Sequence, residues 1–168
     1  MFLNCRFQST FKKLPRFFII LLIGLAAIQT SGAQTKPTSS AIASETESIR
    51  QAILDYVEGV YEVNPKRIEQ SVHPELAKRG FYIKRGETAR SEEPMTFAQL
   101  VELAKTYNLK NRIPKNAPKE IVVFDVLDQT ASAKLTASWG VDYIHLAKYN
   151  GKWMLVNVIW QTLPKPSR

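Results

Sequence analysis

The sequence predicts an α+β fold in which three N-terminal helices pack on a curved, mostly antiparallel sheet. Two observations carry this prediction. Apolar residues recur with helical spacing between residues 45 and 105, whereas from Glu120 onward they follow the two-residue period of strands. A run of helices followed by a run of strands is typical of the α+β class, because each layer buries its apolar face against the other.

The first predicted helix begins near Ser44. Ser44 and Glu47 have the spacing of a capping box, in which each side chain satisfies a backbone N–H group at the start of a helix. Behind them one apolar stripe continues for about four turns. It consists of Ile49, Ala52, Ile53, Tyr56, Val57, Val60 and Tyr61. We expect this stripe to face the core.

Two shorter helices are expected after it. The first follows Asn64-Pro65, carries Ile68 and Val72 on one face, and ends at His73-Pro74, because a residue before proline disfavours the helical conformation. The second follows a capping box formed by Thr96 and Gln99.

The segments around the third helix carry weaker signals. Residues 81–83 are a short strand or an ordered loop, residues 84–94 form a polar loop, and residues 110–119 form a linker with two prolines.

A meander of three or four long strands completes the chain. Residues 121–127 are nearly all apolar, so this strand is expected to be covered on both faces, and residues 131–139 alternate strictly between apolar and polar. Residues 141–149 and 152–161 form a hairpin, because Asn150-Gly151 is a strong signal for a two-residue turn.

The first 33 residues have the pattern of a secretory signal peptide. Four basic residues precede an apolar run from Phe17 to Ile28, and Ser31-Gly32-Ala33 offers a cleavage site before Gln34. An uncleaved membrane anchor is the alternative, but a spanning helix needs about 20 predominantly apolar residues. We expect export to a periplasm or the exterior, with no membrane contact after cleavage.

The sequence after the signal divides into three parts. Residues 34–44 are expected to be a flexible leader, 45–162 the folded domain and 163–168 a tail. With four of the 23 basic residues and no acidic residue in the signal, 19 basic groups face 15 acidic ones. A net charge of +4 without a basic block argues against a nucleic-acid partner.

The hairpin and the segment after the second helix resemble a known family. They read DYIHL running into NGKWMLVNVIW (residues 142–160), and HPELAKR (residues 73–79). Over residues 45–162 the chain resembles the nuclear-transport-factor-2-like superfamily, and within it the bacterial group called putative lumazine-binding proteins. The resemblance implies a cone-shaped, cystatin-like roll around an apolar pocket. It also supports dimers, and superfamily members include isomerases, cyclases, dehydratases and many non-catalytic binders.

The candidate general bases are Asp142, His145, His73 and Asp125, because such an enzyme needs a carboxylate or imidazole in an apolar pocket. Asp142 shares a strand face with apolar residues, His73 ends a helix, and Asp125 is expected to pair with Lys134. The sequence places no acid beside a tyrosine donor, so no catalytic residue is named. Two histidines without cysteine in the mature chain indicate no metal site, and no cofactor is implied.

If a ligand pocket exists, its residues are predicted to be Asp142, Asn157 and Tyr56, the last as apolar wall. A two-residue turn at Asn150-Gly151 pairs Tyr149 with Lys152, so the numbers of paired residues add up to 301 and Asp142 pairs with Ile159. This register puts Asn157 on the face of Asp142 and Trp160 on the opposite face, unless a bulge intervenes.

Three functions compete at this stage. A non-catalytic binder of a small apolar or aromatic molecule is favoured. The alternatives are a structural or protein-interaction module that forms a homodimer through the outer face of its sheet, and an isomerase-, cyclase- or dehydratase-like enzyme. An open pocket with a titratable group beside a donor would distinguish them.

Overall fold

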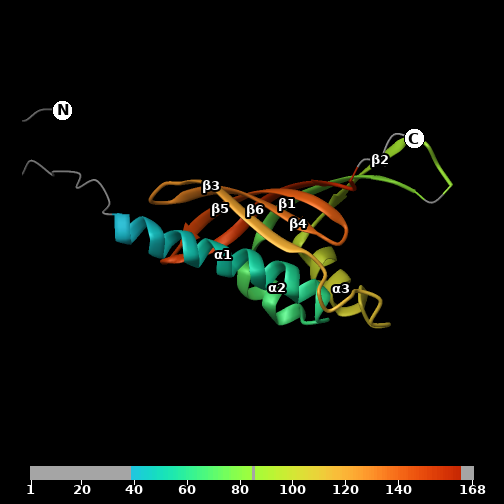
Figure 1. Ribbon diagram of the computed structural model, residues 1–168, viewed down its shortest axis with the longest axis horizontal. Helices are drawn as coiled ribbons and strands as arrows, with labels where there is room; N and C mark the ends of the chain where they lie inside the picture. Colours follow the sequence, from blue (N-terminus) through green and yellow to red (C-terminus); the bar gives the residue numbers. More distant parts are fainter. Residues whose placement is uncertain (1–38, 85, 164–168) are drawn as a thin grey trace, which may run out of the picture. The chain divides into compact units, whose positions relative to one another are not determined.

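The computed structural model describes residues 39–84 and 86–163, which contain three helices and six strands (Figure 1). In chain order these are α1 (Ser39–Tyr61), α2 (Pro65–Ser71), β1 (Val72–Ile83), β2 (Arg90–Met95), α3 (Phe97–Thr106), β3 (Lys119–Val126), β4 (Thr130–Ala137), β5 (Gly140–Tyr149) and β6 (Lys152–Gln161). The predicted signal peptide lies outside the described residues. Within them, no helix has the length and apolar character needed to cross a membrane.

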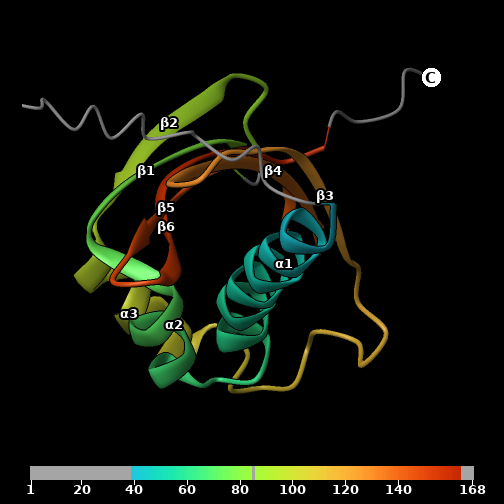
Figure 2. The same ribbon diagram turned by 90° about the vertical axis from the view of Figure 1, so that its left-hand side faces the viewer.

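All six strands belong to one sheet, in the order β2-β1-β6-β5-β4-β3. β1 and β6 pair in parallel, and the other neighbours pair antiparallel. The sheet curves around α1, and the three helices lie on its concave side (Figure 2). The predicted α+β class and the curved, mostly antiparallel sheet are therefore confirmed.

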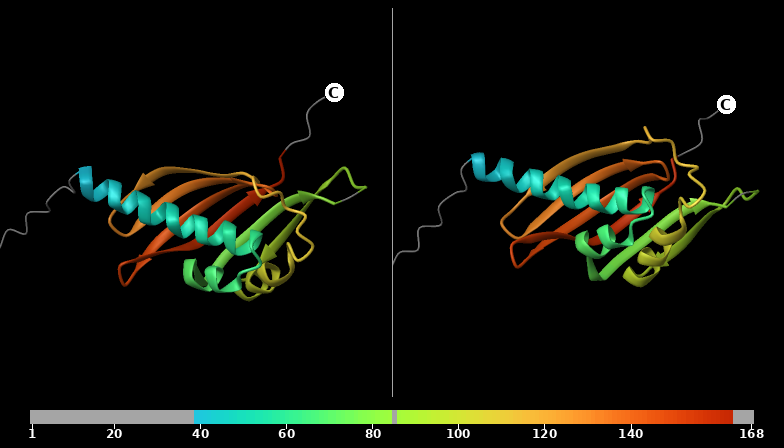
Figure 3. Two further views of the ribbon diagram at one scale, coloured as in Figure 1. Left: turned by 60° about the horizontal axis from the view of Figure 1, so that its bottom comes forward. Right: turned by 90° about the horizontal axis from the view of Figure 1, so that it is seen from below.

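The core lies between α1 and the concave face of the sheet. Every residue of the predicted apolar stripe of α1 is buried, and α1 runs obliquely across the strands (Figure 3). The alternation predicted for β4 is also confirmed: Ala131, Ala133, Leu135 and Ala137 point into the core. Because three of these four inward side chains are alanines, α1 can pack closely against β4.

α1 begins at Ser39, earlier than predicted, so residues 39–44 are helical and not a flexible leader. Ser44 is no cap, because its carbonyl accepts the hydroxyl of Ser48 at 3.0 Å inside the helix. Glu45 instead accepts Nε1 of Trp153 at 2.7 Å and pairs with Lys148 at 2.6 Å. These contacts attach the early turns of α1 to the β5–β6 hairpin.

The second helix is shorter than expected. α2 ends at Ser71, and Val72 already belongs to β1, so the prediction that Val72 is helical and that His73 ends the helix is wrong. The proline after His73 keeps His73 out of the helical conformation, and this restriction is met by an extended strand as well as by the end of a helix. The imidazole of His73 stacks on Tyr149, with the ring centroids 4.3 Å apart.

The polar segment predicted as a loop contains β2, an edge strand paired with a β1 that spans all of residues 72–83. Diagonal contacts replace the missing apolar pattern: Arg79 pairs with Glu92, and the hydroxyl of Tyr82 donates to Glu93 at 2.6 Å. Because β1 and β2 precede α3, the predicted order of all helices before all strands is wrong.

β3 is the opposite edge of the sheet and is not covered on both faces. Val122 and Phe124 are 45% and 55% exposed on the side away from the helices. The expectation that the Thr96–Gln99 capping box opens α3 is confirmed. The linker predicted over residues 110–119 contains no helix or strand up to residue 118, and its last residue, Lys119, already belongs to β3.

Candidate functional site

An apolar pocket lies between α1, α3 and the concave face of the sheet. Its volume is about 70 Å³, and aromatic and aliphatic side chains form most of its wall. The lining residues are Tyr56, Val60, Lys78, Met95, Leu100, Leu103, Tyr107, Trp139 and Trp160. Lys78 is the charged member of this lining.

Asp142 of β5 is fully buried beside this wall and accepts two hydrogen bonds. Its Oδ1 accepts Nε1 of Trp139 at 2.7 Å, and its Oδ2 accepts the hydroxyl of Tyr56 at 2.8 Å. A buried carboxylate without such partners would be very costly. Asp142 therefore holds two aromatic residues of the pocket wall in place.

Lys78 of β1 completes this network. Its side chain is 4% exposed, its Nζ donates to the hydroxyl of Tyr56 at 2.6 Å, and the same nitrogen lies 3.8 Å from Oδ2 of Asp142. Nζ also lies 5.2 Å from the ring centroid of Tyr56 and 5.5 Å from that of Trp160, within the range of cation–π attraction. The ion pair is thus bridged by a hydroxyl and flanked by two rings.

Burial changes the proton affinities of this network. It raises the pKa of Tyr56 well above 10.0, and the charge of Asp142 adds to the effect, because a tyrosinate there would face a carboxylate. Burial also lowers the pKa of Lys78, an effect that the charge of Asp142 opposes. Tyr56 therefore stays a neutral hydroxyl that donates to Asp142.

A bulge in β6 sets which side chains reach the pocket. Leu155 pairs with Leu146, as the predicted register requires, but Asn157 pairs with His145, so Val156 is an extra residue. Beyond the bulge Asp142 is opposite Trp160 and not Ile159. Trp160 therefore lines the pocket, and its predicted place on the outer face is wrong.

Gly80 of β1 makes room for that indole. It pairs with Trp160 across the parallel β1–β6 ladder, and a Cβ atom at this position would come within 2.3 Å of the indole ring. The indole also stacks nearly parallel to Tyr82, with the ring centroids 6.1 Å apart. Only glycine fits under the ring, so Gly80 fixes the position of this wall.

Of the three predicted pocket residues, two lie at the pocket and one lies on the outer face of the sheet. Tyr56 and Asp142 meet at the pocket, and Tyr56 contributes a hydroxyl as well as apolar wall. Asn157 lies on the outer face, where its amide donates to the carbonyl of Ala77 at 3.0 Å, so the prediction that it shares a face with Asp142 is wrong. The bulge at Val156 is the physical reason.

The other candidate bases do not reach the pocket. His145 lies on the outer face, 3.3 Å from Asn157. Asp125 is exposed and accepts the backbone N–H of Val126, and the expected pair with Lys134 is absent because that lysine is opposite Val122. These groups lie outside the candidate site.

The sequence did not indicate that Lys78 and Trp139 are polar partners of Asp142 at this site. Lys78 lies 22 residues from Tyr56 and 64 from Asp142 along the chain, in a segment predicted to follow a helix. The conclusion that no acid lies beside a tyrosine donor was wrong for the same reason, since 86 residues separate Tyr56 from Asp142. The signal that could have identified Lys78 is its position in β1, where it alternates with its neighbours and falls on the face of the strand that points to the core.

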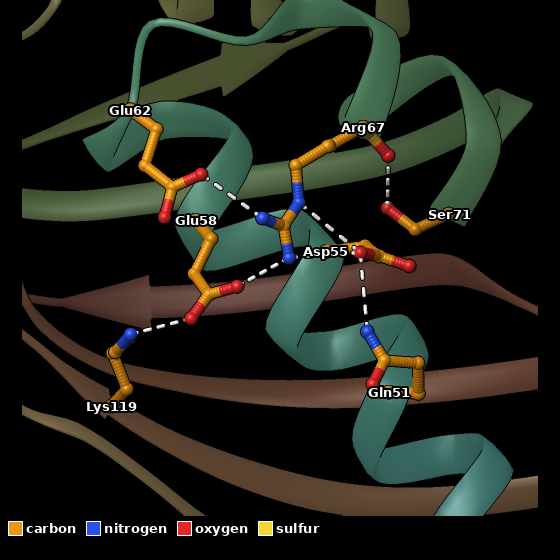
Figure 4. Close-up of polar contacts among 7 residues, drawn as sticks. All are labelled: Gln51, Asp55, Glu58, Glu62, Arg67, Ser71 and Lys119. Carbon is orange, nitrogen blue, oxygen red and sulfur yellow. Dashed lines mark hydrogen bonds and ion pairs between the residues drawn. The ribbon is translucent and has the colours of Figure 1, made fainter.

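A second polar cluster, around Arg67, joins α1 to α2 (Figure 4). The guanidinium contacts Asp55 at 3.0 Å, Glu62 at 3.0 Å and Glu58, which also pairs with Lys119. Burial raises the pKa of Glu58, but its bond from Lys119 and the charge of Arg67 outweigh this and lower it. Because each charged side chain in the cluster pairs with one of opposite charge, we assign it a structural role.

Among residues 39–84 and 86–163, no group of three or more His, Cys, Asp or Glu side chains is arranged to hold a metal ion.

Solved structures that are similar in fold include an NTF2-like protein of unknown function from Shewanella baltica (17% identity, TM-score 0.55, covering 77% of this chain and 100% of that chain). Another, from Methylobacillus flagellatus, has 19% identity and a TM-score of 0.51 over 77% of this chain and 97% of that chain. A protein named putative scytalone dehydratase, from Novosphingobium aromaticivorans, has 10% identity and a TM-score of 0.50 over 78% and 94%.

These identities support the fold alone, and a search of curated proteins gave no match. The family itself is shown by a sequence model described as "Putative lumazine-binding", which matches residues 44–161 and so spans the helices and the whole sheet. The chain therefore belongs to this family, and its fold is similar to that of NTF2-like proteins of known structure.

Proposed function

We propose that this protein is a non-catalytic binder of a small apolar or aromatic molecule, held in the pocket between α1, α3 and the sheet. The observation that carries the proposal is the chemistry of the wall. Trp139, Trp160 and Tyr107 offer aromatic surface, and Leu100 and Leu103 offer aliphatic surface. The polar groups of the lining, Nζ of Lys78 and the hydroxyl of Tyr56, lie 2.6 Å apart, and we call this pair the polar end of the pocket. Apolar walls with a few placed polar groups are characteristic of small-molecule sites.

The carboxylate at this site is a poor general base, which favours binding over catalysis. Both oxygens of Asp142 already accept hydrogen bonds, from Trp139 and Tyr56, and Lys78 compensates its charge. Asp142 is fully buried and is not part of the pocket lining. To take a proton from a ligand it would have to break a contact that orients the wall.

The volume limits the ligand. One water molecule needs roughly 10–15 Å³ of cavity volume. The pocket, at about 70 Å³, therefore accommodates a few water-sized groups. The pocket therefore suits a small ring or one end of a larger molecule. Lumazine belongs in the first ligand set because of the family description, beside simple aromatic compounds.

A binding assay on a pocket-filling variant tests this function. Leu103→Trp places a large ring in the pocket, whereas Leu109→Trp makes the same exchange at a residue that is 63% exposed and outside the lining. Native mass spectrometry and thermal shift against lumazine, indole and ethylbenzene should show binding that Leu103→Trp abolishes and Leu109→Trp keeps. Binding that survives in Leu103→Trp, or no binding in the wild-type protein, would contradict the proposal.

A homodimer formed through the outer face is the second candidate function. Val122, Tyr143 and Ile159 lie on this face in one row that also contains Lys134, and these three side chains are 45%, 54% and 47% exposed. Exposed apolar side chains gathered on one face favour association. Light scattering at tens of micromolar should give a dimer that Tyr143→Glu dissociates, and a monomeric wild-type protein would remove this candidate.

Export is proposed on the sequence of residues 1–33 alone. The intact mass of the protein recovered from producing cells should correspond to a chain that begins at Gln34. A full-length species found in the membrane fraction would contradict cleavage.

A further inference from the structure

We propose that the polar end of the pocket recognises a neutral carbonyl group, with the ammonium of Lys78 as the hydrogen-bond donor. This inference rests on the proposed binding function and names the class of ligand: small, flat, uncharged molecules that carry a ketone or ring carbonyl.

Hydrogen bonds within the network already use most of the polar atoms at that end. The two oxygens of Asp142 accept from Trp139 and Tyr56, the indole N–H of Trp139 is used, and the hydroxyl of Tyr56 both donates to Asp142 and accepts from Lys78. A lysine ammonium has three N–H donors and no acceptor. One is used on Tyr56, and Asp142 at 3.8 Å is beyond hydrogen-bond distance.

Because Asp142 is not part of the pocket lining, the unused N–H donors of Lys78 are the strongest hydrogen-bonding groups that this network offers to the pocket. In the described part of the chain, the other groups close to Nζ are the rings of Tyr56 and Trp160, at 5.2 and 5.5 Å from their centroids. Rings attract the ammonium but do not replace an oxygen acceptor. A ligand that presents an oxygen lone pair to Nζ supplies the missing acceptor.

The ion pair at this end of the pocket carries no net charge. Lys78 and Asp142 compensate each other, and their side chains are 4% and 0% exposed. An anionic ligand would leave one negative charge uncompensated in a buried place, which is costly. A carbonyl oxygen satisfies the donor without changing the charge, so the site favours a ketone over a carboxylate of the same size.

The donor lies among aromatic side chains of the pocket wall. Lys78 shares the pocket lining with Trp160 and Trp139, and Gly80 holds the Trp160 ring against β1. A flat ring can contact an indole while its carbonyl approaches Nζ. Hydrocarbon contact and one hydrogen bond to a charged donor then act together.

Three probes of nearly equal shape test this inference: acetophenone, ethylbenzene and benzoate. On the wild-type protein, acetophenone should bind about tenfold more tightly than ethylbenzene, as expected for one hydrogen bond to a charged group. It should also bind more tightly than benzoate. Tighter binding of benzoate, or equal affinities for acetophenone and ethylbenzene, would overturn the inference while leaving the binding function intact.

Variants assign the preference to Lys78. Lys78→Met keeps the length of the side chain and removes the donor, and the double variant Lys78→Met/Asp142→Asn does so without leaving a lone buried charge. Both should bind acetophenone and ethylbenzene equally, whereas Lys134→Met on the outer face should keep the preference. If neither acetophenone nor ethylbenzene binds the wild-type protein, the proposed binding function itself is wrong. A ketone preference that survives in the double variant would overturn the role of Lys78.

Discussion

The hydroxyl of Tyr56 lies 2.8 Å from Oδ2 of Asp142, and this contact ties the middle of α1 to β5 at the edge of the pocket. Since the hydroxyl also accepts from Lys78, the helix, β5 and β1 share one buried polar connection. Loss of any member should therefore affect both stability and the shape of the pocket wall.

Asp142→Asn should be strongly destabilising. The substitution nearly conserves shape but leaves the ammonium of Lys78 buried without a counter-charge, so we expect a loss of roughly 3–5 kcal/mol in the free energy of unfolding. Urea denaturation measures it. Asp125→Asn, at an exposed acid, is the matched control and should stay within about 0.5 kcal/mol of wild type. An unchanged stability of Asp142→Asn would show that the charges are not coupled.

Gly80→Ala should displace the indole of Trp160. The added methyl overlaps the ring, and forcing extra atoms into a packed site costs about 1–3 kcal/mol. The same change in a Trp160→Leu background should cost much less, because the overlapping ring is absent. Equal costs in the two backgrounds, measured by urea denaturation, would contradict the close approach.

Tyr56→Phe should alter the stability of the protein in alkali. The folded-state pKa of Tyr56 is raised, chiefly by burial, so its stabilising effect is present below pH 10.0 and is lost as the pH rises above that value, where an unfolded tyrosine ionises. The wild type should lose up to about 1.4 kcal/mol per pH unit from this group. Denaturation between pH 8 and 11 should show a shallower decline for Tyr56→Phe, while Tyr143→Phe should follow wild type.

Glu45→Gln should reduce the sensitivity of the protein to acid. Hydrogen bonds from Lys148 and Trp153 lower the pKa of Glu45 below 4.5, so its contribution is present above pH 4.5 and is lost as the pH falls through the lowered value. The carboxylate is partly exposed, so the effect should be small. Thermal melts between pH 3 and 6 should show a flatter profile for Glu45→Gln than for wild type. Glu47→Gln, at a side chain that is 74% exposed, should retain the wild-type profile.

Local patterns predicted those parts of the fold that depend on neighbouring residues. The Asn150-Gly151 turn forms with positive φ at both residues, 51° and 80°, and pairs Tyr149 with Lys152 as expected. The Thr96–Gln99 cap and the stripe of α1 follow in the same way. These features are determined by periodicity and by backbone hydrogen bonds within a few residues.

The site was predicted less completely because its contacts are long-range. Asp142 and Tyr56 were expected at the pocket, but the sequence did not indicate that Lys78 would be buried beside them, since its strand begins directly after a helix. β2 escaped prediction because an edge strand needs no apolar face. The bulge at Val156 leaves no compositional signal, so Asn157 and Trp160 exchanged their predicted faces.

That bulge gives β6 two reading frames. From Lys152 to Leu155 the odd-numbered residues face the core, and from Asn157 to Gln161 the even-numbered residues do so. A deletion of Val156 would therefore remove the bulge and leave Trp160 opposite Asp142, whereas a ladder in which Val156 took the place opposite His145 would shift the frame and carry Trp160 to the outer face. The identity of the pocket wall depends on this one residue being left out of the ladder as much as on the kinds of residue around it.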